Sequence, residues 1–399
     1  MPLLAALLAL ASPLPPTQVG AVEVPFRKGE TNMVVEALVN GRKVSLLFDS
    51  GYSADVVMNS SVNVGPTMGA VTVTDFVGQT SMNTVKLKSL KVGPKTIAIA
   101  SDAHIMQQDA DFSDDDGRID GILGFSAFKD SPFTIDFQHS KLIFHPKGYD
   151  VTTRKADNKK TFMEKLAPIG HSSLEMFVKT ADGKSMTMAL DTGNANYATT
   201  HPDILERIGL WNVGKEVKYT HLGYIASGPV ESFSIKMPQL TIFGIPTPPT
   251  VWDVINVPSA TAEGDGTVGY GFLKHFNITI DYPRRRVFFE NWDAPYSNEE
   301  SAEVGLVALT NPEVKRVLVY NVTPGGPADL AGIKRLDTIL SVDGEDLDRV
   351  SYQKFRKMME GKAGTSVKLV YSHNGSLKRT ELKRTLLVND ALEPAKAAG

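Results

Sequence analysis

The sequence predicts a mainly β protein built from two homologous β-rich halves and a C-terminal α+β domain. Three observations lead to this prediction. Two blocks of sequence recur within the chain, and short runs rich in Val, Ile, Phe and Thr alternate with Gly, Asn, Asp and Pro clusters. Beyond about residue 303 the pattern changes. A chain of 399 residues is long enough for two or three domains, each with its own core.

The composition argues against several classes of function. The 45 acidic and 42 basic residues give a net charge of −3, so we expect no nucleic acid and no anionic membrane as a partner. The chain contains no cysteine, which excludes disulfides, thiolate catalysis and cysteine-based zinc sites. The apolar content of 42% is ordinary for a globular protein.

The first 21 residues predict export. They contain the short apolar run PLLAALLALAS, followed by small residues that suit a cleavage site. This run is too short for a transmembrane helix, and we expect no stable membrane span elsewhere. The first basic residue is Arg27, so the basic segment that usually opens a secretory signal is missing. The sequence therefore predicts a secreted or periplasmic protein with an atypical signal peptide over 1–21.

Two repeated blocks reveal an internal duplication. Residues 34–51 align without a gap with 176–193, at an offset of 142. Residues 120–144 align with 265–289, at an offset of 145. Because each block keeps one offset, duplication explains the match better than chance.

The duplication sets the expected domain boundaries. We expect homologous lobes at 22–150 and 163–292, joined by a polar linker at 151–162. Both copies of the first block contain a tight-turn dipeptide, Asn40-Gly41 and Asp182-Gly183, and each predicts a β-hairpin.

Each half contains an Asp-Ser/Thr-Gly tripeptide at the end of an apolar run. Asp49 lies in LLFDSG and Asp191 lies in MALDTG. A single tripeptide of this kind indicates no more than a turn. Two copies at equivalent positions of a duplication can meet across a pseudo-twofold axis, each partly buried. The sequence therefore predicts a pair of neighbouring carboxyl groups.

Such a pair has a defined chemistry. Two carboxylates about 3 Å apart cannot both ionise, so they share one proton. The ionised carboxylate takes a proton from water, and the protonated one donates to the carbonyl under attack. The hydroxyls of Ser50 and Thr192 can bond across to the other half, and Gly51 and Gly193 permit a close approach of the backbone.

These motifs resemble those of the pepsin/retropepsin clan of aspartic peptidases, in a bacterial two-lobed form. That clan carries a hydrophobic-hydrophobic-Gly segment after each catalytic motif. Here the segments supply Ile122, Leu123 and Gly124 in the first half, and Val268 and Gly269 after an unusual Thr267 in the second. The resemblance implies two lobes with a cleft between them, catalytic Asp49 and Asp191, and neither a metal nor a cofactor.

The same resemblance implies a β-hairpin that covers the cleft. The candidate is 71–87, with Phe76 and Gly78 near its tip, and its repeat counterpart is 218–228. An ordinary surface hairpin fits this stretch equally well.

The C-terminal part, 303–388, resembles a PDZ domain of the bacterial protease-associated kind. The resemblance rests on GPADLAGI, on DTILSVDG and on a following helix capped by Ser351, and it departs at Leu336, where Gly is usual. It implies a groove in which Gly305, Leu306 and Val307 receive a C-terminal peptide, or a domain used only for packing. We expect the tail at 389–399 to be disordered.

Together these features predict an exported aspartic endopeptidase whose PDZ domain holds substrate or partner peptides. Its partners would be peptides or proteins. The alternative from another class is a catalytically silent scaffold on the same fold. A carboxylate-pair glycosidase is a further alternative, and it would hold the two acids at least about 5 Å apart.

Overall fold

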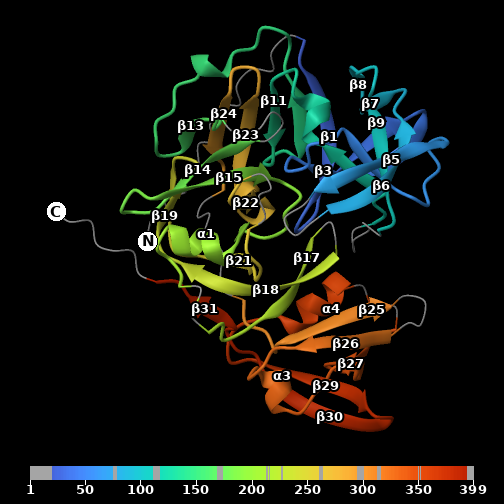
Figure 1. The fold of residues 1–399 in the computed structure, drawn as a ribbon, viewed down its shortest axis with the longest axis vertical. Coiled ribbons are helices and arrows are strands. Elements are labelled where there is room, and N and C mark those ends of the chain that lie inside the picture. The colour runs from blue at the N-terminus through green and yellow to red at the C-terminus, as the bar shows by residue number, and fades with distance from the viewer. Residues whose placement is uncertain are drawn as a thin grey trace, which may run out of the picture.

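The computed structural model describes residues 20–392 except for 75–78, 111–116, 169–173, 213, 215, 226–227, 260–263, 294–300, 312–315, 349 and 351. Within these residues the protein is mainly β, with a few short helices, and its strands form three hydrogen-bonded sheets (Figure 1). The predicted fold class is confirmed at this level.

The largest sheet contains the first half of the chain and the closing strands of the second. Its path runs β13-β24-β23-β11-β12-β1-β2-β3-β10-β4-β9-β6-β5, and β7 and β8 attach beside β2. In chain order these strands are β1 (Val22–Lys28), β2 (Met33–Val39), β3 (Arg42–Asp49), β4 (Val56–Asn59), β5 (Thr67–Thr74), β6 (Gln79–Lys86), β7 (Leu90–Val92), β8 (Lys95–Ile97), β9 (His104–Gln108), β10 (Gly121–Gly124), β11 (Phe133–Asp136), β12 (Lys141–Phe144), β13 (Thr161–Lys165), β23 (Phe276–Asp281) and β24 (Arg286–Asn291). Two 3₁₀ turns, η1 (Phe125–Phe128) and η2 (Val151–Thr153), lie between them.

The second sheet contains the rest of the second half. Its path runs β17-β18-β21-β16-β22-β15-β14-β19-β20, and β31 pairs with β18. These strands are β14 (Glu175–Lys179), β15 (Ser185–Asp191), β16 (Ala198–Thr200), β17 (His221–Ile225), β18 (Gly228–Met237), β19 (Leu240–Ile242), β20 (Ile245–Thr247), β21 (Thr250–Ile255), β22 (Gly266–Gly269) and β31 (Val388–Asp390). The helices α1 (Pro202–Arg207) and α2 (Tyr270–Leu273) belong to this half.

The two halves repeat one strand order. From the first Asp motif outward the order is β3-β10-β4-β9-β6-β5, and from the second it is β15-β22-β16-β21-β18-β17. In both, the strand that ends at the Asp pairs in parallel with the strand that ends in Gly. In both, the series ends in an antiparallel hairpin, β5–β6 or β17–β18. The duplication inferred from sequence is thus visible in the topology.

The axis that relates the halves passes between β11 and β23. These strands pair antiparallel, and the repeat equivalents Thr134 and Thr279 lie opposite each other. Their hydroxyl oxygens are 2.8 Å apart, and both residues are buried. Buried Phe side chains on both sides of this junction, such as Phe133 and Phe289, belong to one continuous apolar core. The shared core fixes the position of one Asp motif relative to the other.

The C-terminal domain has its own sheet and core. The strands, in the order β25-β26-β27-β29-β30 with β28 beside β27, are β25 (Leu306–Asn311), β26 (Arg316–Val322), β27 (Thr338–Val342), β28 (Glu345–Asp346), β29 (Ser366–His373) and β30 (Ser376–Lys383). The helices are α3 (Pro327–Leu330) and α4 (Tyr352–Met359). Phe355 and Met359 on α4 are buried in this core, as their spacing predicts. The predicted cap Ser351 lies outside the described residues.

Two predicted boundaries are wrong. The linker at 151–162 is not a loose connection, because Val151 is fully buried and its N–H donates to Asp281 Oδ2 over 3.3 Å. Its last two residues already belong to β13. The tail at 389–399 is ordered at its start, because Asn389 and Asp390 lie in β31. Both segments look polar in sequence, but each forms hydrogen bonds with strands or side chains of the second half. Residues 393–399 lie outside the described part.

The predicted export signal cannot be placed, since residues 1–19 of the 1–21 segment lie outside the described residues. In the described part of the chain, no helix has the length and apolar character needed to cross a bilayer.

Leu336 occupies the position where the resemblance predicts Gly, and its backbone explains why Gly is usual there. Its φ is 73°, in the left-handed region, and its side chain is 68% exposed. Leu in this conformation costs about 1–2 kcal/mol, and little burial offsets the cost.

We therefore expect Leu336→Gly to stabilise the C-terminal domain by up to about 1 kcal/mol, after the extra chain entropy of Gly is subtracted. Chemical denaturation of the full chain measures the change. A loss of stability would show that the Leu336 side chain makes a contact worth more than the relieved strain.

Candidate active site

The two Asp motifs meet at the ends of parallel strand pairs. Asp49 ends β3 opposite Gly124 of β10, and Asp191 ends β15 opposite Gly269 of β22. Leu123 and Val268, one residue before these glycines, are fully buried and anchor the two short strands. The predicted support segments 122–124 and 268–269 therefore lie directly beside the carboxyl groups. Their apolar neighbours hold the strand ends in place.

A reciprocal set of hydrogen bonds locks the motifs together. The Ser50 N–H donates to Thr192 Oγ1 over 3.0 Å, and the Thr192 N–H donates to Ser50 Oγ over 3.0 Å. The Ser50 hydroxyl donates to the Leu190 carbonyl over 2.9 Å, and the Thr192 hydroxyl donates to the Phe48 carbonyl over 2.8 Å. Both side chains are buried, so these four bonds compete with no solvent. Each hydroxyl thus accepts a backbone N–H from the other half and donates to a backbone carbonyl of the other half, so both halves need a hydroxyl at this position.

The glycines of the motifs make room for the carboxyl groups. A Cβ on Gly51 would overlap the Asp191 carboxyl, and a Cβ on Gly193 would overlap the Asp49 carboxyl. Each carboxyl oxygen Oδ1 accepts two backbone N–H groups of its own turn, at 2.9 and 3.1 Å in both halves. The carboxyl groups also hydrogen-bond to each other. This contact is closer than the separation that a glycosidase pair requires.

One neighbour distinguishes the two acids. Thr267, which departs from the apolar pattern in the sequence, hydrogen-bonds to Asp191 and also accepts Asn194 Nδ2 over 2.7 Å. Its repeat equivalent is Ile122, which has no hydroxyl. Sequence reasoning noted Thr267 only as an irregularity and missed Asn194 entirely. The signal that could have found them is a polar residue at one of two otherwise apolar repeat positions.

This asymmetry favours the negative charge on Asp191. Burial raises the pKa of Asp49 well above its usual range, and the neighbouring Asp191 raises it further. Burial also raises the pKa of Asp191, but the hydrogen bonds from Asp49, from its own turn and from Thr267 oppose that rise. The pair therefore shares one proton, and the extra hydrogen bond to Asp191 favours the negative charge on that side. Such a pair can take a proton from water and give one to a carbonyl oxygen.

An apolar surface lies beside Asp49. Tyr52, three residues after Asp49, packs with Val71 and Val73 of β5 against buried Met82 of β6 and Met106 of β9. The hairpin β5–β6 overlaps the predicted cleft cover at 71–87, and β17 lies within its predicted counterpart at 218–228, which ends at the first residue of β18. Phe76 and Gly78 lie outside the described residues, so the role of this tip stays a prediction.

The predicted peptide groove lies in the C-terminal domain, away from the acids. Gly305 has a φ of 71° and precedes β25, and Leu306 and Val307 open that strand. β25 is an edge strand that pairs with β26 on one side only, among the described strands. An edge strand with one free side can accept an added peptide strand.

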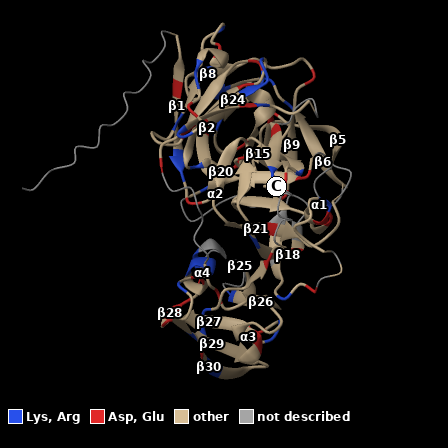
Figure 2. Ribbon diagram, turned by 90° about the vertical axis from the view of Figure 1, so that its left-hand side faces the viewer, with Lys and Arg blue, Asp and Glu red and all other residues tan. Residues whose placement is uncertain are grey.

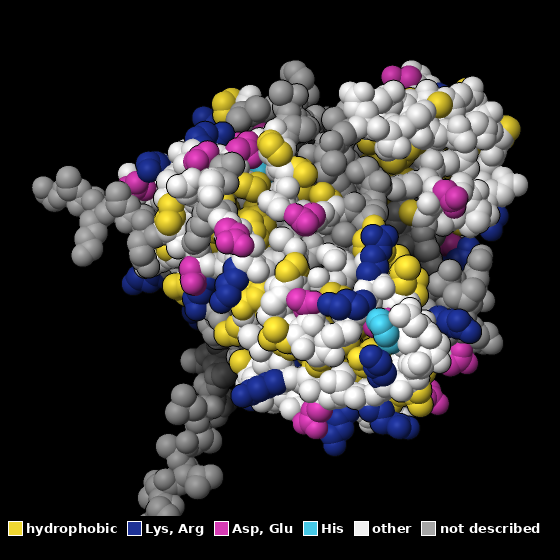
Figure 3. Space-filling model, turned by 60° about the horizontal axis from the view of Figure 1, so that its bottom comes forward, with side chains coloured by type: hydrophobic (Ala, Val, Ile, Leu, Met, Phe, Trp, Pro, Cys, Tyr) yellow, Lys and Arg dark blue, Asp and Glu magenta, His cyan; other side chains and the backbone are white. Residues whose placement is uncertain are grey.

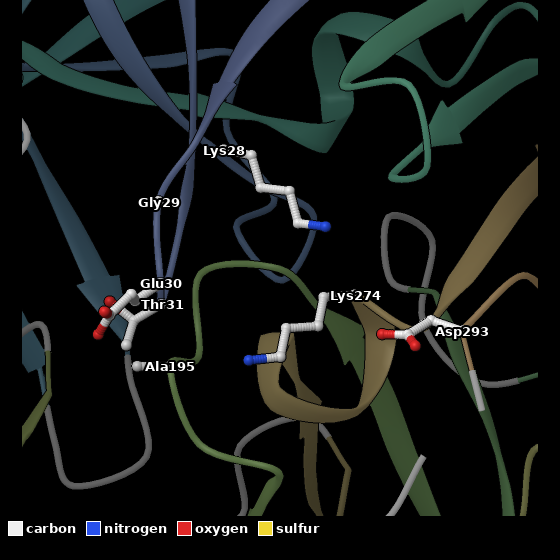
Figure 4. Close-up of a pocket in the computed structure, with 7 residues that line it drawn as sticks. All are labelled: Lys28, Gly29, Glu30, Thr31, Ala195, Lys274 and Asp293. Carbon is white, nitrogen blue, oxygen red and sulfur yellow. The ribbon is translucent and has the colours of Figure 1, made fainter. Parts of the chain in front are cut away.

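A separate pocket of about 440 Å³ lies where the two halves meet. Residues of both halves line it: Lys28, Gly29, Glu30, Thr31, Ala195, Lys274 and Asp293. Figure 4 shows the Lys28 and Lys274 side chains inside it, with Asp293 pointing toward Lys274. Burial lowers the pKa of Lys28, and so does Lys274. The acids Glu30 and Asp293 also line the pocket, and neither member of the carboxyl pair does. Among the described residues no cluster of His and acidic side chains could hold a metal ion.

Asp49→Asn should stabilise the protein, and more so at high pH. The native state keeps the proton of Asp49 at pH values where the unfolded chain has lost it, so native stability falls as pH rises above about 4. Asn cannot ionise and still accepts the turn N–H groups. We expect a higher melting temperature than the native protein at pH 7, by about 2–4 °C per kcal/mol, and a smaller difference at pH 4. Calorimetry at both values measures this, and an equal difference at both would contradict the raised pKa.

Thr267→Val should raise the pKa of Asp191, because it removes a hydrogen bond to the charged form. The acidic limb of any pH–rate profile governed by Asp191 should then move to higher pH. Thr199→Val is the matched control, since Thr199 Oγ1 accepts Asn194 Nδ2 over 3.0 Å but has no recorded bond to Asp191. An equal shift in both variants would assign the effect to Asn194 instead.

The comparisons with known proteins identify the C-terminal domain. A family model described as "PDZ domain" matches residues 318–371, so this predicted domain is confirmed. A carboxyl-terminal-processing protease of Picosynechococcus is 40% identical over 70 residues, which is 18% of this chain and 17% of that protein. A probable CtpA-like serine protease of Staphylococcus haemolyticus is 30% identical over 81 residues, which is 20% of this chain and 16% of its own length.

The solved structures give a similar picture. A photosystem II D1 C-terminal processing protease matches at 28% identity and a TM-score of 0.22, over 22% of this chain and 24% of its own. An aspartic proteinase from Irpex lacteus matches at 14% identity and a TM-score of 0.41, over 70% of this chain and 100% of its own. Both TM-scores are too low to establish a shared overall fold.

These findings correct the predicted function. The curated relatives are named as carboxyl-terminal-processing proteases or peptidases, and one is named a serine protease, so they contradict an exported aspartic endopeptidase of the pepsin/retropepsin clan. They do not favour a silent scaffold either. None of these relatives is named as an aspartic peptidase, the class that the Asp-Ser/Thr-Gly motifs suggested. The chain spans only 16–25% of the length of these relatives.

Proposed function

We propose that this protein is a peptidase that processes other proteins close to their C-termini. In this proposal the PDZ domain holds the free C-terminal segment, and the carboxyl pair of the body is the reaction centre. The PDZ match and the names of the relatives support the first part. One observation supports the second: half-buried Asp49 and buried Asp191 lie in mutual hydrogen-bond contact, and both have raised pKa values, as is typical of functional sites.

The chemistry follows from the shared proton. A water between the carboxyl groups loses a proton to ionised Asp191 as its oxygen attacks the peptide carbonyl carbon. Asp49 gives its proton to the carbonyl oxygen, which leaves a neutral tetrahedral diol. The diol collapses as Asp191 returns its proton to the leaving nitrogen and Asp49 regains one from a hydroxyl. No bond forms between protein and substrate.

The two halves supply complementary parts of this centre. We place the substrate between β5–β6 and β17–β18, with the apolar surface around Tyr52 next to the scissile bond. A tethered C-terminus raises the local concentration of the substrate without a new contact at the acids. Export remains part of the proposal, since such processing fits a protein outside the cytosol.

A serine mechanism, as in the name of the Staphylococcus relative, makes a different demand on the structure. The described residues do bring Ser232, His221 and Asp253 to one face of neighbouring strands. His221 Nε2 lies 2.8 Å from Asp253 Oδ1. Ser232, however, is fully buried and its hydroxyl has no hydrogen-bond partner. A nucleophile needs both access to substrate and a base within reach. We therefore do not propose these three residues as a second active site, and a substitution of Ser232 serves as a control variant.

The test compares Asp49→Asn, Asp191→Asn and Ser232→Ala in the full chain. The substrates are a peptide library with free C-termini and the same library with C-terminal amides. We expect each Asp variant to lose about 10²–10⁴-fold in kcat/KM, the usual share of acid–base catalysis. Ser232→Ala should keep its activity, and the free C-termini should be preferred.

Labelling with a fluorophosphonate, which reacts with activated serines, decides between the mechanisms. We expect no label. A stoichiometric label together with full activity of both Asp variants would place the reaction on a serine and refute the role of the carboxyl pair. Equal cleavage of free and amidated peptides would refute only the recognition of C-termini and would leave the role of the carboxyl pair standing.

A further inference from the structure

The hairpin β17–β18 is tied to the chain that follows the PDZ domain. β31 pairs in parallel with β18, with Ile235 opposite Asn389. Asn389 is only 5% exposed and uses its whole side-chain amide. Its Oδ1 accepts the Lys218 N–H over 2.9 Å, and its Nδ2 donates to the carbonyls of Tyr219 (3.2 Å) and Ser234 (3.1 Å). The C-terminal strand thus clamps the stretch that leads into β17.

The PDZ domain grips the same stretch from its other side. The Thr323 hydroxyl donates to the Thr220 carbonyl over 2.7 Å, and Thr323 is 3% exposed. The Thr323 N–H donates to the Gly305 carbonyl over 2.9 Å. Gly305 begins the loop that would receive a peptide carboxylate. Thr323 therefore connects that loop to Thr220, the residue directly before β17, through two hydrogen bonds.

Charged groups close the same junction. Glu303, just before the loop, has His221 of β17, Arg356 of α4 and the acidic Glu360 as its charged neighbours. Lys357 of α4 reaches Glu30 of the first half at 3.0 Å. Figure 2 shows the basic residues of α4 where this helix faces the body. On the underside of the molecule, in contrast, Lys and Arg are interspersed with Asp and Glu (Figure 3).

We propose that Thr323 and Asn389 are positioning residues that join the PDZ loop at Gly305–Val307 and the hairpin β17–β18 into one coupled unit. A peptide carboxylate bound at the loop shifts Gly305 and, through Thr323, the root of β17. β17–β18 ends the strand series that begins at Asp191, as β5–β6 ends the series that begins at Asp49. In this proposal the position of β17–β18 sets access to the carboxyl pair. The PDZ domain then regulates the proposed peptidase as well as tethering its substrate. This inference rests on the proposed function.

Coupling of this kind requires differential binding. A peptide can change the hairpin only if it binds the two hairpin positions with different affinity. The inference is therefore reciprocal: a hairpin held in place should also change the affinity of the PDZ loop. Both directions can be measured without any cleavage.

The experiment measures hydrogen exchange in the full chain carrying Asp49→Asn, so that no peptide is consumed. The probe is a mixture of random heptapeptides with free α-carboxylates, and the control is the same mixture with C-terminal amides. We expect the free peptides to change exchange of the amides in 218–225 at least threefold, and the amidated peptides to leave it unchanged. Thr323→Val, which keeps the side-chain shape, should abolish that change.

Thr365→Val is the matched control, because its hydroxyl also donates to a backbone carbonyl over 2.7 Å but within the PDZ domain. It should respond as the parent does. An equal response in Thr323→Val, or a response confined to the PDZ domain, would overturn the coupling while leaving the proposed function intact. Exchange does not depend on turnover, so an inactive carboxyl pair would leave this result readable. In the active chain, we further expect Thr323→Val to lower kcat on a short amidated substrate only where free peptide is present.

Discussion

Two carboxyl groups held in hydrogen-bond contact with each other are the constraint on which the rest of this structure depends. Left alone, each would ionise at neutral pH and repel the other. The protein prevents this by fixing one proton between them. That requires a rigid frame, since a shift of the strand ends would move the two acids apart. The four hydrogen bonds of Ser50 and Thr192 supply the frame at the centre. The shared apolar core supplies it at a distance.

The duplication explains how such a frame arises from a simple pattern. Each half offers one acid at the end of one strand, with the same outward series of strands. Exact symmetry would make the two acids equivalent, and the shared proton would reside equally on either carboxyl group. Thr267 in place of an apolar residue breaks that equivalence. This hydroxyl favours the negative charge on Asp191.

Much of this could be predicted from the sequence, because the relevant signals are local. The repeat offset placed both Asp motifs, and the change of texture near residue 303 placed the PDZ domain. The errors came from long-range contacts. The segments at 151–162 and 389–399 look like solvated chain, yet Val151 and Asn389 are buried against distant strands. The predicted clan and function failed for a related reason, since short motifs fix a local geometry and leave the family open. No local sequence pattern predicts the role of Thr323, because its hydrogen-bond partner Thr220 lies 103 residues away in the chain.

The most direct test of the shared proton is a ¹³C NMR titration of the full chain with carboxyl-labelled aspartate, assigned with Asp49→Asn and Asp191→Asn. We expect the pair to carry one negative charge over a wide pH range, with Asp49 still protonated after the exposed aspartates have ionised. Asp191 should then titrate in a single step once Asp49 is replaced by Asn. Two independent titrations near the usual aspartate pKa would show that the acids do not share a proton, and would contradict the proposed centre.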